Sequence, residues 1–144
     1  MPTRTATARW DGPFGDGGGT MSFGSGAFEG AYSAGSRFES DPGTNPEELI
    51  AAAHAGCFSM ALSLALGDAG HEPESIETEA NVRISKSDGG FEIDRIDLRT
   101  SASVPGIEQG DFERVAEAAK QGCPVSKALA GVGEIVLDAR LKQS

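Results

Sequence analysis

The sequence predicts a single α+β domain that spans residues 1–144. Short extended segments come first, a long apolar helix follows, and a hairpin then precedes two more helices and a final strand. Strands and helices that do not alternate one by one are typical of the α+β class. The length suits one domain, and the chain shows neither a repeat nor a linker.

The first forty residues alternate polar and apolar side chains between glycines. We expect strands at residues 5–10 and 20–23, with a turn or loop at 15–19. A third extended segment is expected at residues 32–38.

A long helix is expected to begin after Asn45. Asn45 suits the N-cap, Pro46 suits the first helical position, and Gly67 and Gly70 suit the end. The apolar residues form two stripes: Leu49, Ala53, Cys57, Met60 and Leu64; and Phe58, Leu62 and Leu66. A helix that is apolar all round is expected to be buried all round, and in so small a chain this calls for a partner. Its alanines, serines and His54 make it a poor membrane span.

The second half of the chain predicts a hairpin followed by two helices and a strand. Ser87-Asp88-Gly89-Gly90 is a strong turn signal, and the apolar phase slips at Asp94-Arg95, which indicates a β-bulge. The expected elements are hairpin strands around 76–84 and 91–98, a helix at about 111–121 capped by Asp111, a short helix from Cys123 to about Leu129, and a strand at 135–141.

Charge and composition exclude several classes of partner. The net charge of −10 argues against nucleic acid and against an anionic membrane surface. Met1 to Trp10 lacks the apolar core of a secretory signal, so we expect a cytoplasmic protein. In a reducing compartment, two cysteines are more often catalytic, redox-active or metal-binding than a disulfide scaffold.

Local chemistry distinguishes the two cysteines. Cys123 lies between Gly122 and Pro124 at an expected helix N-cap, where backbone N–H groups favour a thiolate. The alternative is a small buried residue at a helix junction. Cys57 lies about three turns into its helix among apolar residues, where desolvation raises a thiol pKa and core packing is the plainer interpretation. Local physics therefore selects Cys123 as the nucleophile.

Three motifs change that ranking. Residues 45–63 read NPEELIAAAHAGCFSMALS and closely resemble the first cysteine motif of the OsmC/Ohr family, the osmotically inducible and organic hydroperoxide resistance proteins. Residues 122–126 resemble the second cysteine motif of that family, and residues 35–39 its arginine segment. The likeness covers nearly the whole chain in order. The Arg37-Phe38 segment resembles that of the OsmC branch of the family rather than that of the Ohr branch.

The resemblance implies a role for each matching residue. Cys57 corresponds to the peroxidatic cysteine, Cys123 to the resolving cysteine, Arg37 to the activating arginine and Glu47 to the carboxylate that holds it. It further implies an OsmC-like fold with antiparallel sheets and a long buried central helix, in an intertwined homodimer. The implied chemistry has an organic hydroperoxide as substrate, a disulfide intermediate and a dithiol reductant, for example a lipoyl-bearing protein. Neither a cofactor nor a metal is expected.

Other interpretations remain open. The same cysteine pair suits a redox sensor or binding protein without turnover, or a structural dimer with two core cysteines. Without the resemblance, Arg37 reads as a solvated strand residue and Glu47 as a plain helix-start carboxylate. His54 is interpreted as a packed helix residue, and a zinc set with His71 is disfavoured because the ligand spacing is diffuse.

Overall fold

The computed structural model describes residues 2–142 and confirms the α+β class. In chain order its elements are β1 (Ala6–Asp11), β2 (Gly18–Phe23), β3 (Glu29–Tyr32), α1 (Ala34–Phe38), α2 (Pro46–Asp68), β4 (Ser75–Ser87), β5 (Gly90–Ser103), α3 (Gln109–Gly122), α4 (Pro124–Ala128) and β6 (Glu134–Leu141). The chain divides into two compact units between Leu49 and Ile50, with α2 running across the boundary. The assignment of residues 1–144 to a single domain stays a prediction.

The first unit contains the antiparallel sheet β1-β2-β3, and its first two strands lie where the glycine-separated alternations predicted them. Gly19 pairs with Trp10 on one side and with Tyr32 on the other. A Cβ at Gly19 would collide with the Arg9 carbonyl oxygen and the Tyr32 ring. The missing side chain lets Trp10 and Tyr32 meet edge to face across the sheet, with ring centroids 5.3 Å apart.

The expected extended segment at 32–38 is wrong beyond Tyr32, because α1 forms there instead. The Ser36 amide donates to Ser33 Oγ at 3.1 Å, and the Ser33 amide donates to Ser36 Oγ at 2.8 Å. These reciprocal bonds are a capping box, which satisfies two backbone donors at the start of the helix. The usual glutamate or glutamine at the third helical position is replaced by serine, so the signal was missed.

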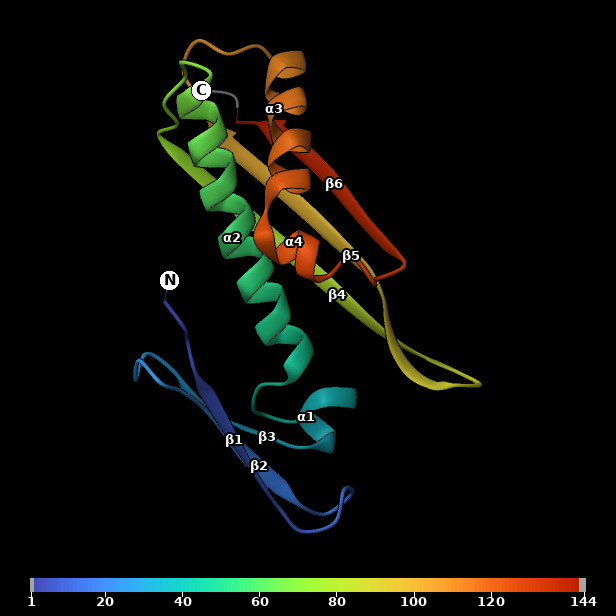
Figure 1. Ribbon diagram of the computed structural model, residues 1–144. Helices are drawn as coiled ribbons and strands as arrows, with labels where there is room; N and C mark the ends of the chain where they lie inside the picture. Colours follow the sequence, from blue (N-terminus) through green and yellow to red (C-terminus); the bar gives the residue numbers. More distant parts are fainter. Residues whose placement is uncertain (1, 143–144) are drawn as a thin grey trace. The chain divides into compact units, whose positions relative to one another are not determined.

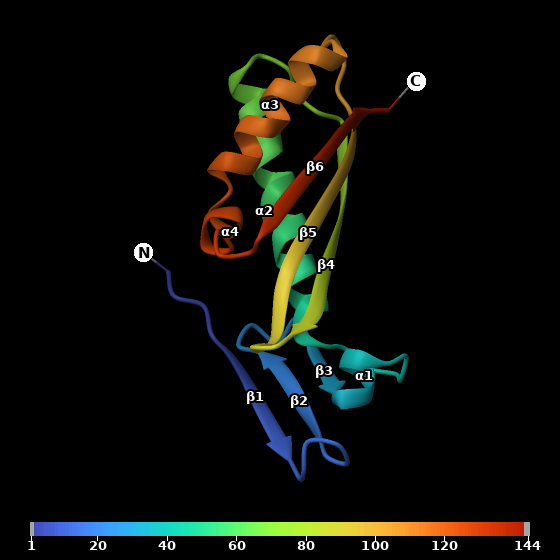
Figure 2. The same ribbon diagram turned by 90° about the vertical axis from the view of Figure 1, so that its right-hand side faces the viewer.

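The second unit is built on the sheet β4-β5-β6, with α2, α3 and α4 against one face (Figures 1 and 2). The β4–β5 hairpin and its bulge are confirmed: Arg83 pairs with Arg95, but Ile84 pairs with Ile93, which leaves Asp94 as the extra residue. The expectation of purely antiparallel sheets is wrong here, because β6 runs parallel to β5. The α3–α4 connection carries the chain back along the sheet, as a parallel pairing requires.

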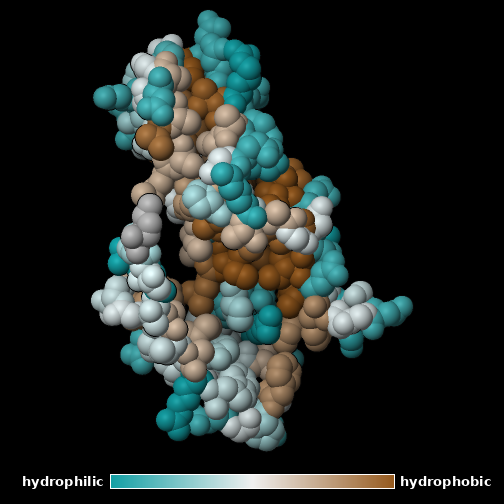
Figure 3. Space-filling model, in the orientation of Figure 1, coloured by the Kyte–Doolittle hydropathy of each residue, from teal (hydrophilic) through white to brown (hydrophobic). Residues whose placement is uncertain are grey.

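Only one side of α2 is buried. Phe58, Leu62 and Leu66 are fully buried in the core. Met60 and Leu64, on the other stripe, are 76% and 68% exposed. The expectation of a helix buried all round is therefore wrong for the single chain, because the sheet and α3–α4 cover one side only; Figure 3 shows apolar surface where α2 lies in Figure 1. By length and composition alone, α2 is also apolar enough to cross a bilayer, a test that core helices pass as well.

Helix α3 begins earlier than predicted. Its N-cap is Glu108, and Asp111 lies within the first turn rather than at the cap. The first helical residue, Gln109, donates from Nε2 to the Ala139 carbonyl at 3.0 Å and accepts at Oε1 from the Leu141 amide at 3.1 Å. These bonds to β6 fix the start of α3. Because they are made with a distant strand, the local capping pattern around Asp111 could not predict them.

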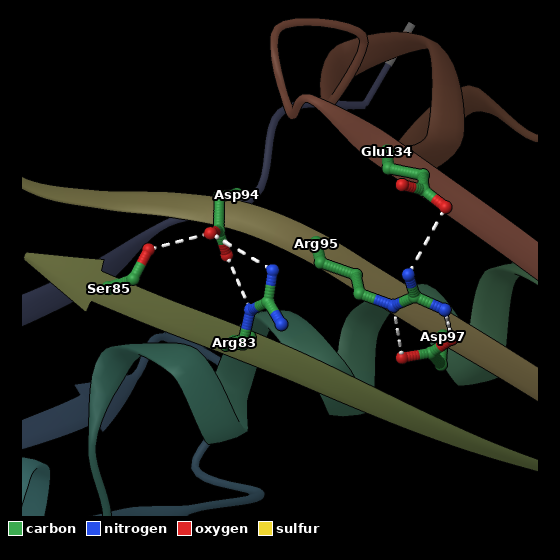
Figure 4. A network of polar contacts seen from close by, with 6 residues as sticks. All are labelled: Arg83, Ser85, Asp94, Arg95, Asp97 and Glu134. Atoms are coloured by element: carbon green, nitrogen blue, oxygen red, sulfur yellow. Dashed lines mark hydrogen bonds and ion pairs between the residues drawn. The ribbon is translucent and has the colours of Figure 1, made fainter.

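The opposite face of the same sheet carries paired charges (Figure 4). Arg83 binds Asp94 bidentately at 2.9 and 3.1 Å, and this pairing lowers the pKa of Asp94 to about 2. Arg95 makes a similar pair with Asp97 and reaches Glu134 on β6. Exposed pairs of this kind contribute little to stability, but they keep this face of the sheet polar.

The core of the second unit predicts a large cost for truncating Phe112, which is fully buried on α3. Phe112→Ala should lower the free energy of unfolding by about 3–5 kcal/mol, the usual cost of a large core cavity. Arg114→Ala, a change on the exposed side of the same helix, should cost less than about 0.5 kcal/mol. Urea unfolding measures both; equal losses would contradict the assigned core.

Candidate functional site

The two cysteines, 66 positions apart in sequence, lie side by side in the second unit. Cys57 Sγ and Cys123 Sγ are 3.1 Å apart, and both thiols are free. Cys123 closes α3 through its amide, which donates to the Ala119 carbonyl at 2.8 Å, and it is also the N-cap of α4. Pro124 at the first position of α4 ends one helix and starts the next, which turns Cys123 toward α2.

The environment of Cys57 disfavours its thiolate. Burial raises the pKa of Cys57. The Val125 amide opposes this rise, and the neighbouring Cys123 thiol adds to it. The desolvation expected from the sequence is confirmed in direction.

The environment of Cys123 favours its thiolate. Burial acts to raise the pKa of Cys123, but the Ser126 amide, the Cys57 thiol, and the Ser126 hydroxyl and Val125 amide together lower it below its ordinary value. The N-cap position predicted from the sequence is confirmed, and so is the direction of its effect. Within this unit Cys123 is therefore the more acidic thiol.

The first unit joins Arg37 and Glu47. Arg37 Nε lies 2.9 Å from Glu47 Oε1 and Nη2 lies 3.0 Å from Oε2, a bidentate pair with the carboxylate nearly buried. Asn45 caps α2 as predicted, accepting from the Glu48 amide at 2.8 Å, and its side chain also donates to the Ser36 carbonyl of α1. The two helix ends are thereby tied together, which fixes the plane of the guanidinium.

An aromatic pocket of about 260 Å³ adjoins Arg37. Its lining residues are Trp10, Phe14, Tyr32, Ser33, Ala34 and Arg37. None of the sequence motifs predicted this pocket. The available signal was Gly19, which allows the aromatic residues of β1 and β3 to meet across β2.

His54 is fully buried, which confirms its interpretation as a packed helix residue. Its Nε2 lies 2.7 Å from Ser126 Oγ. Burial lowers the pKa of His54, so the ring is neutral at physiological pH. No local pattern predicts this contact, because the two residues are 72 positions apart.

The four residues predicted for the site thus form two pairs, one in each unit: Cys57 with Cys123, and Arg37 with Glu47. One pair offers two thiols at near-bonding distance. The other offers an oriented cation beside an aromatic pocket. Among the described residues, no group of three or more histidine, cysteine or acidic side chains is arranged to hold a metal ion.

Comparison with known proteins gives the class of this chain. Residues 38–137 match the family described as OsmC-like protein. The chain is 51% identical over 136 residues to peroxiredoxin OsmC of Escherichia coli, covering 94% of each chain. It is 36% identical over 97 residues to organic hydroperoxide resistance protein-like 2 of Staphylococcus epidermidis, covering 66% of each.

Solved structures agree with this class. The organic hydroperoxide resistance protein of Elizabethkingia anophelis superposes with a TM-score of 0.75 at 28% identity, over 100% of this chain and 98% of that one. OhrB of Bacillus subtilis superposes with a TM-score of 0.72 at 28% identity, over 96% and 98%. The chain belongs to the OsmC-like protein family, and the resemblance read from its motifs is confirmed.

The contact between the two sulfur atoms predicts an intramolecular disulfide. An S–S bond is about 2.05 Å long, so closure from 3.1 Å needs a movement of only about 1 Å. Treatment with the thiol oxidant diamide should make the whole chain two hydrogens lighter in intact-mass analysis, without dimer on a non-reducing gel. Cys57→Ser should abolish that loss; disulfide-linked dimers as the main product would contradict the pairing.

Proposed function

We propose that this chain is a cysteine-based peroxidase that reduces organic hydroperoxides to alcohols. The observation that carries the proposal is the 3.1 Å contact between Cys57 and Cys123, which lets one oxidised sulfur be captured by the other. The names of the relatives, peroxiredoxin and organic hydroperoxide resistance protein, support the same chemistry.

In the proposed cycle, the Cys57 thiolate attacks the distal oxygen of ROOH. The S–O bond forms as the O–O bond breaks, and the departing alkoxide takes a proton to become the alcohol. Cys57 is left as a sulfenic acid, which condenses with the Cys123 thiol to give the disulfide and water. An external dithiol, for example a lipoyl-bearing protein, then reduces the disulfide by exchange.

Arg37 is assigned the activation of this chemistry. Because burial raises the pKa of Cys57, a cation is needed to favour its thiolate and the developing charge on the leaving oxygen. Arg37 is suited to this role because Glu47 holds its guanidinium in a fixed plane. The aromatic pocket beside Arg37 supports an organic substituent on the peroxide rather than hydrogen peroxide itself.

We assign the protein to the cytoplasm as a homodimer that works without a cofactor. Met60 and Leu64 are exposed one turn apart on α2. This supports self-association, because contiguous exposed apolar side chains commonly mark a protein–protein interface. An intertwined dimer would cover this stripe and restore the burial on all sides that the helix composition predicts.

A sensor that uses the same cysteines is the second candidate, favoured by the raised pKa of Cys57, which slows a nucleophile. The two are separated by turnover: with excess dithiol, the peroxidase should consume cumene hydroperoxide continuously, whereas a sensor should oxidise once and stop. After one equivalent of hydroperoxide, wild type should be two hydrogens lighter, and Cys123→Ser one oxygen heavier at Cys57. Absence of any mass change in either protein would overturn the peroxidase assignment.

The role assigned to Arg37 predicts that Cys57 oxidation slows even when the positive charge at position 37 is kept. Arg37→Lys keeps the charge but loses the bidentate geometry, and should slow Cys57 oxidation by about 10²-fold, the order seen when one oxyanion donor is lost. Arg83→Lys is the matched control, since Arg83 also binds a carboxylate bidentately, on the polar face of the other sheet. Stopped-flow oxidation should show the control unchanged; equal rates for both variants would refute the role.

A further inference from the structure

The proposed cycle leaves one buried titratable residue unused. His54 lies on α2 three residues before Cys57, is fully buried, and has its Nε2 2.7 Å from Ser126 Oγ. Its Nδ1 is buried without a hydrogen-bond partner among the residues that the structure describes. An imidazole in such a place costs free energy, so its one strong contact calls for an explanation.

Ser126 connects this histidine with the cysteine pair. It lies three residues after Cys123 in α4, the short helix that Cys123 caps, and it is nearly buried. Its hydroxyl and amide both act to lower the pKa of Cys123. The helix geometry brings the two residues together, because the third residue of a helix lies beside its N-cap residue, just as His54 lies one turn before Cys57 on α2. The Ser126 hydroxyl therefore contacts His54, and Ser126 is the neighbour of Cys123 on α4.

The position of the imidazole proton decides what Ser126 can donate. A charged ring would bury an Nδ1–H without an acceptor, so the ring is neutral, in line with its lowered pKa. If Nε2 carries the proton, it donates to Ser126 Oγ, and the serine proton is free to turn toward Cys123. If Nδ1 carries the proton, the Ser126 hydroxyl donates to the His54 ring and cannot donate a hydrogen bond to the Cys123 sulfur.

Resting on the proposed peroxidase function, we propose that His54 and Ser126 are positioning residues for the resolving step. His54, protonated at Nε2, holds the Ser126 hydroxyl so that its proton faces the Cys123 sulfur. The resulting hydrogen bond favours the Cys123 thiolate that attacks the Cys57 sulfenic acid. The pair acts after the peroxide has been consumed and has no part in the first oxidation.

The step balances within the proposed cycle. The Cys123 thiol loses its proton, its sulfur attacks the Cys57 sulfur, the S–S bond forms, and the S–O bond of the sulfenic acid breaks. Hydroxide leaves and takes up a proton, so that the products are the disulfide and one water. Ser126 and His54 end the step with the protons they held at its start.

The test separates the two half-reactions by rapid mixing with cumene hydroperoxide, quenching and intact-mass analysis. The rise of the species one oxygen heavier reports the first oxidation, and its conversion to the species two hydrogens lighter reports resolution. Ser126→Ala should slow resolution by about 10-fold or more, the size expected when a hydrogen bond to a charged group is lost. Its first oxidation rate should equal that of wild type.

His54 is tested by a double-mutant comparison. His54→Leu should slow resolution as much as Ser126→Ala, and the double variant should be no slower than either, because one residue acts through the other. His54→Gln, which retains an N–H donor near Nε2, should recover much of the rate. Ser59→Ala is the matched control: this serine also lies on α2 and bonds Thr78 Oγ1 at the same 2.7 Å, and its loss should leave resolution unchanged.

The possible results lead to distinct conclusions. Unchanged resolution in Ser126→Ala, or additive losses in the double variant, would overturn the inference while the peroxidase assignment stands. A wild type that gains no oxygen and loses no hydrogen would overturn the proposed function itself. Nitrogen-15 NMR of the reduced protein gives a readout independent of turnover and of variant folding: His54 should be neutral with its proton on Nε2, and a proton on Nδ1 would overturn the inference.

Discussion

The packing of one side of α2 against the second sheet fixes the direction in which His54 and Cys57 point. His54, Phe58, Leu62 and Leu66 follow one another at intervals of four, and all are fully buried. Each large apolar side chain in this stripe contributes roughly 1.5–3 kcal/mol, so rotating the helix about its axis would be costly. Cys57, one position from Phe58, is thereby held at the edge of the buried stripe and against Cys123.

The two sulfur atoms touch, yet their surroundings act in opposite directions. Cys57 is embedded in a helix whose amides are already bonded to one another, so burial dominates and its pKa rises. Cys123 stands at a helix start where amides are still free, and its pKa falls despite burial. The surroundings of Cys123 therefore lower its pKa by local means, whereas the role that we propose for Cys57 needs a cation, the part that we assign to Arg37.

Sequence alone predicted the elements whose signals are local: the Asn45 cap, the β4–β5 hairpin and the bulge at Asp94. It failed where distant contacts decide. The α3 start depends on Gln109 bonding to β6, and the exposure of Met60 depends on which surfaces one chain provides. The motifs supplied both pairs of site residues, whereas no local pattern links His54 to Ser126.

The parallel pairing of β5 and β6 has a consequence for how the chain assembles. The β4–β5 hairpin closes through a tight turn, so its contacts form between near neighbours in sequence. Strand β6 can pair with β5 only once the two intervening helices have returned the chain to the other edge of β5. A parallel pair has no tight turn from which strand pairing can begin. Closing this longer loop costs entropy before the pairing stabilises anything, so we expect the β5–β6 pairing to form after the β4–β5 hairpin.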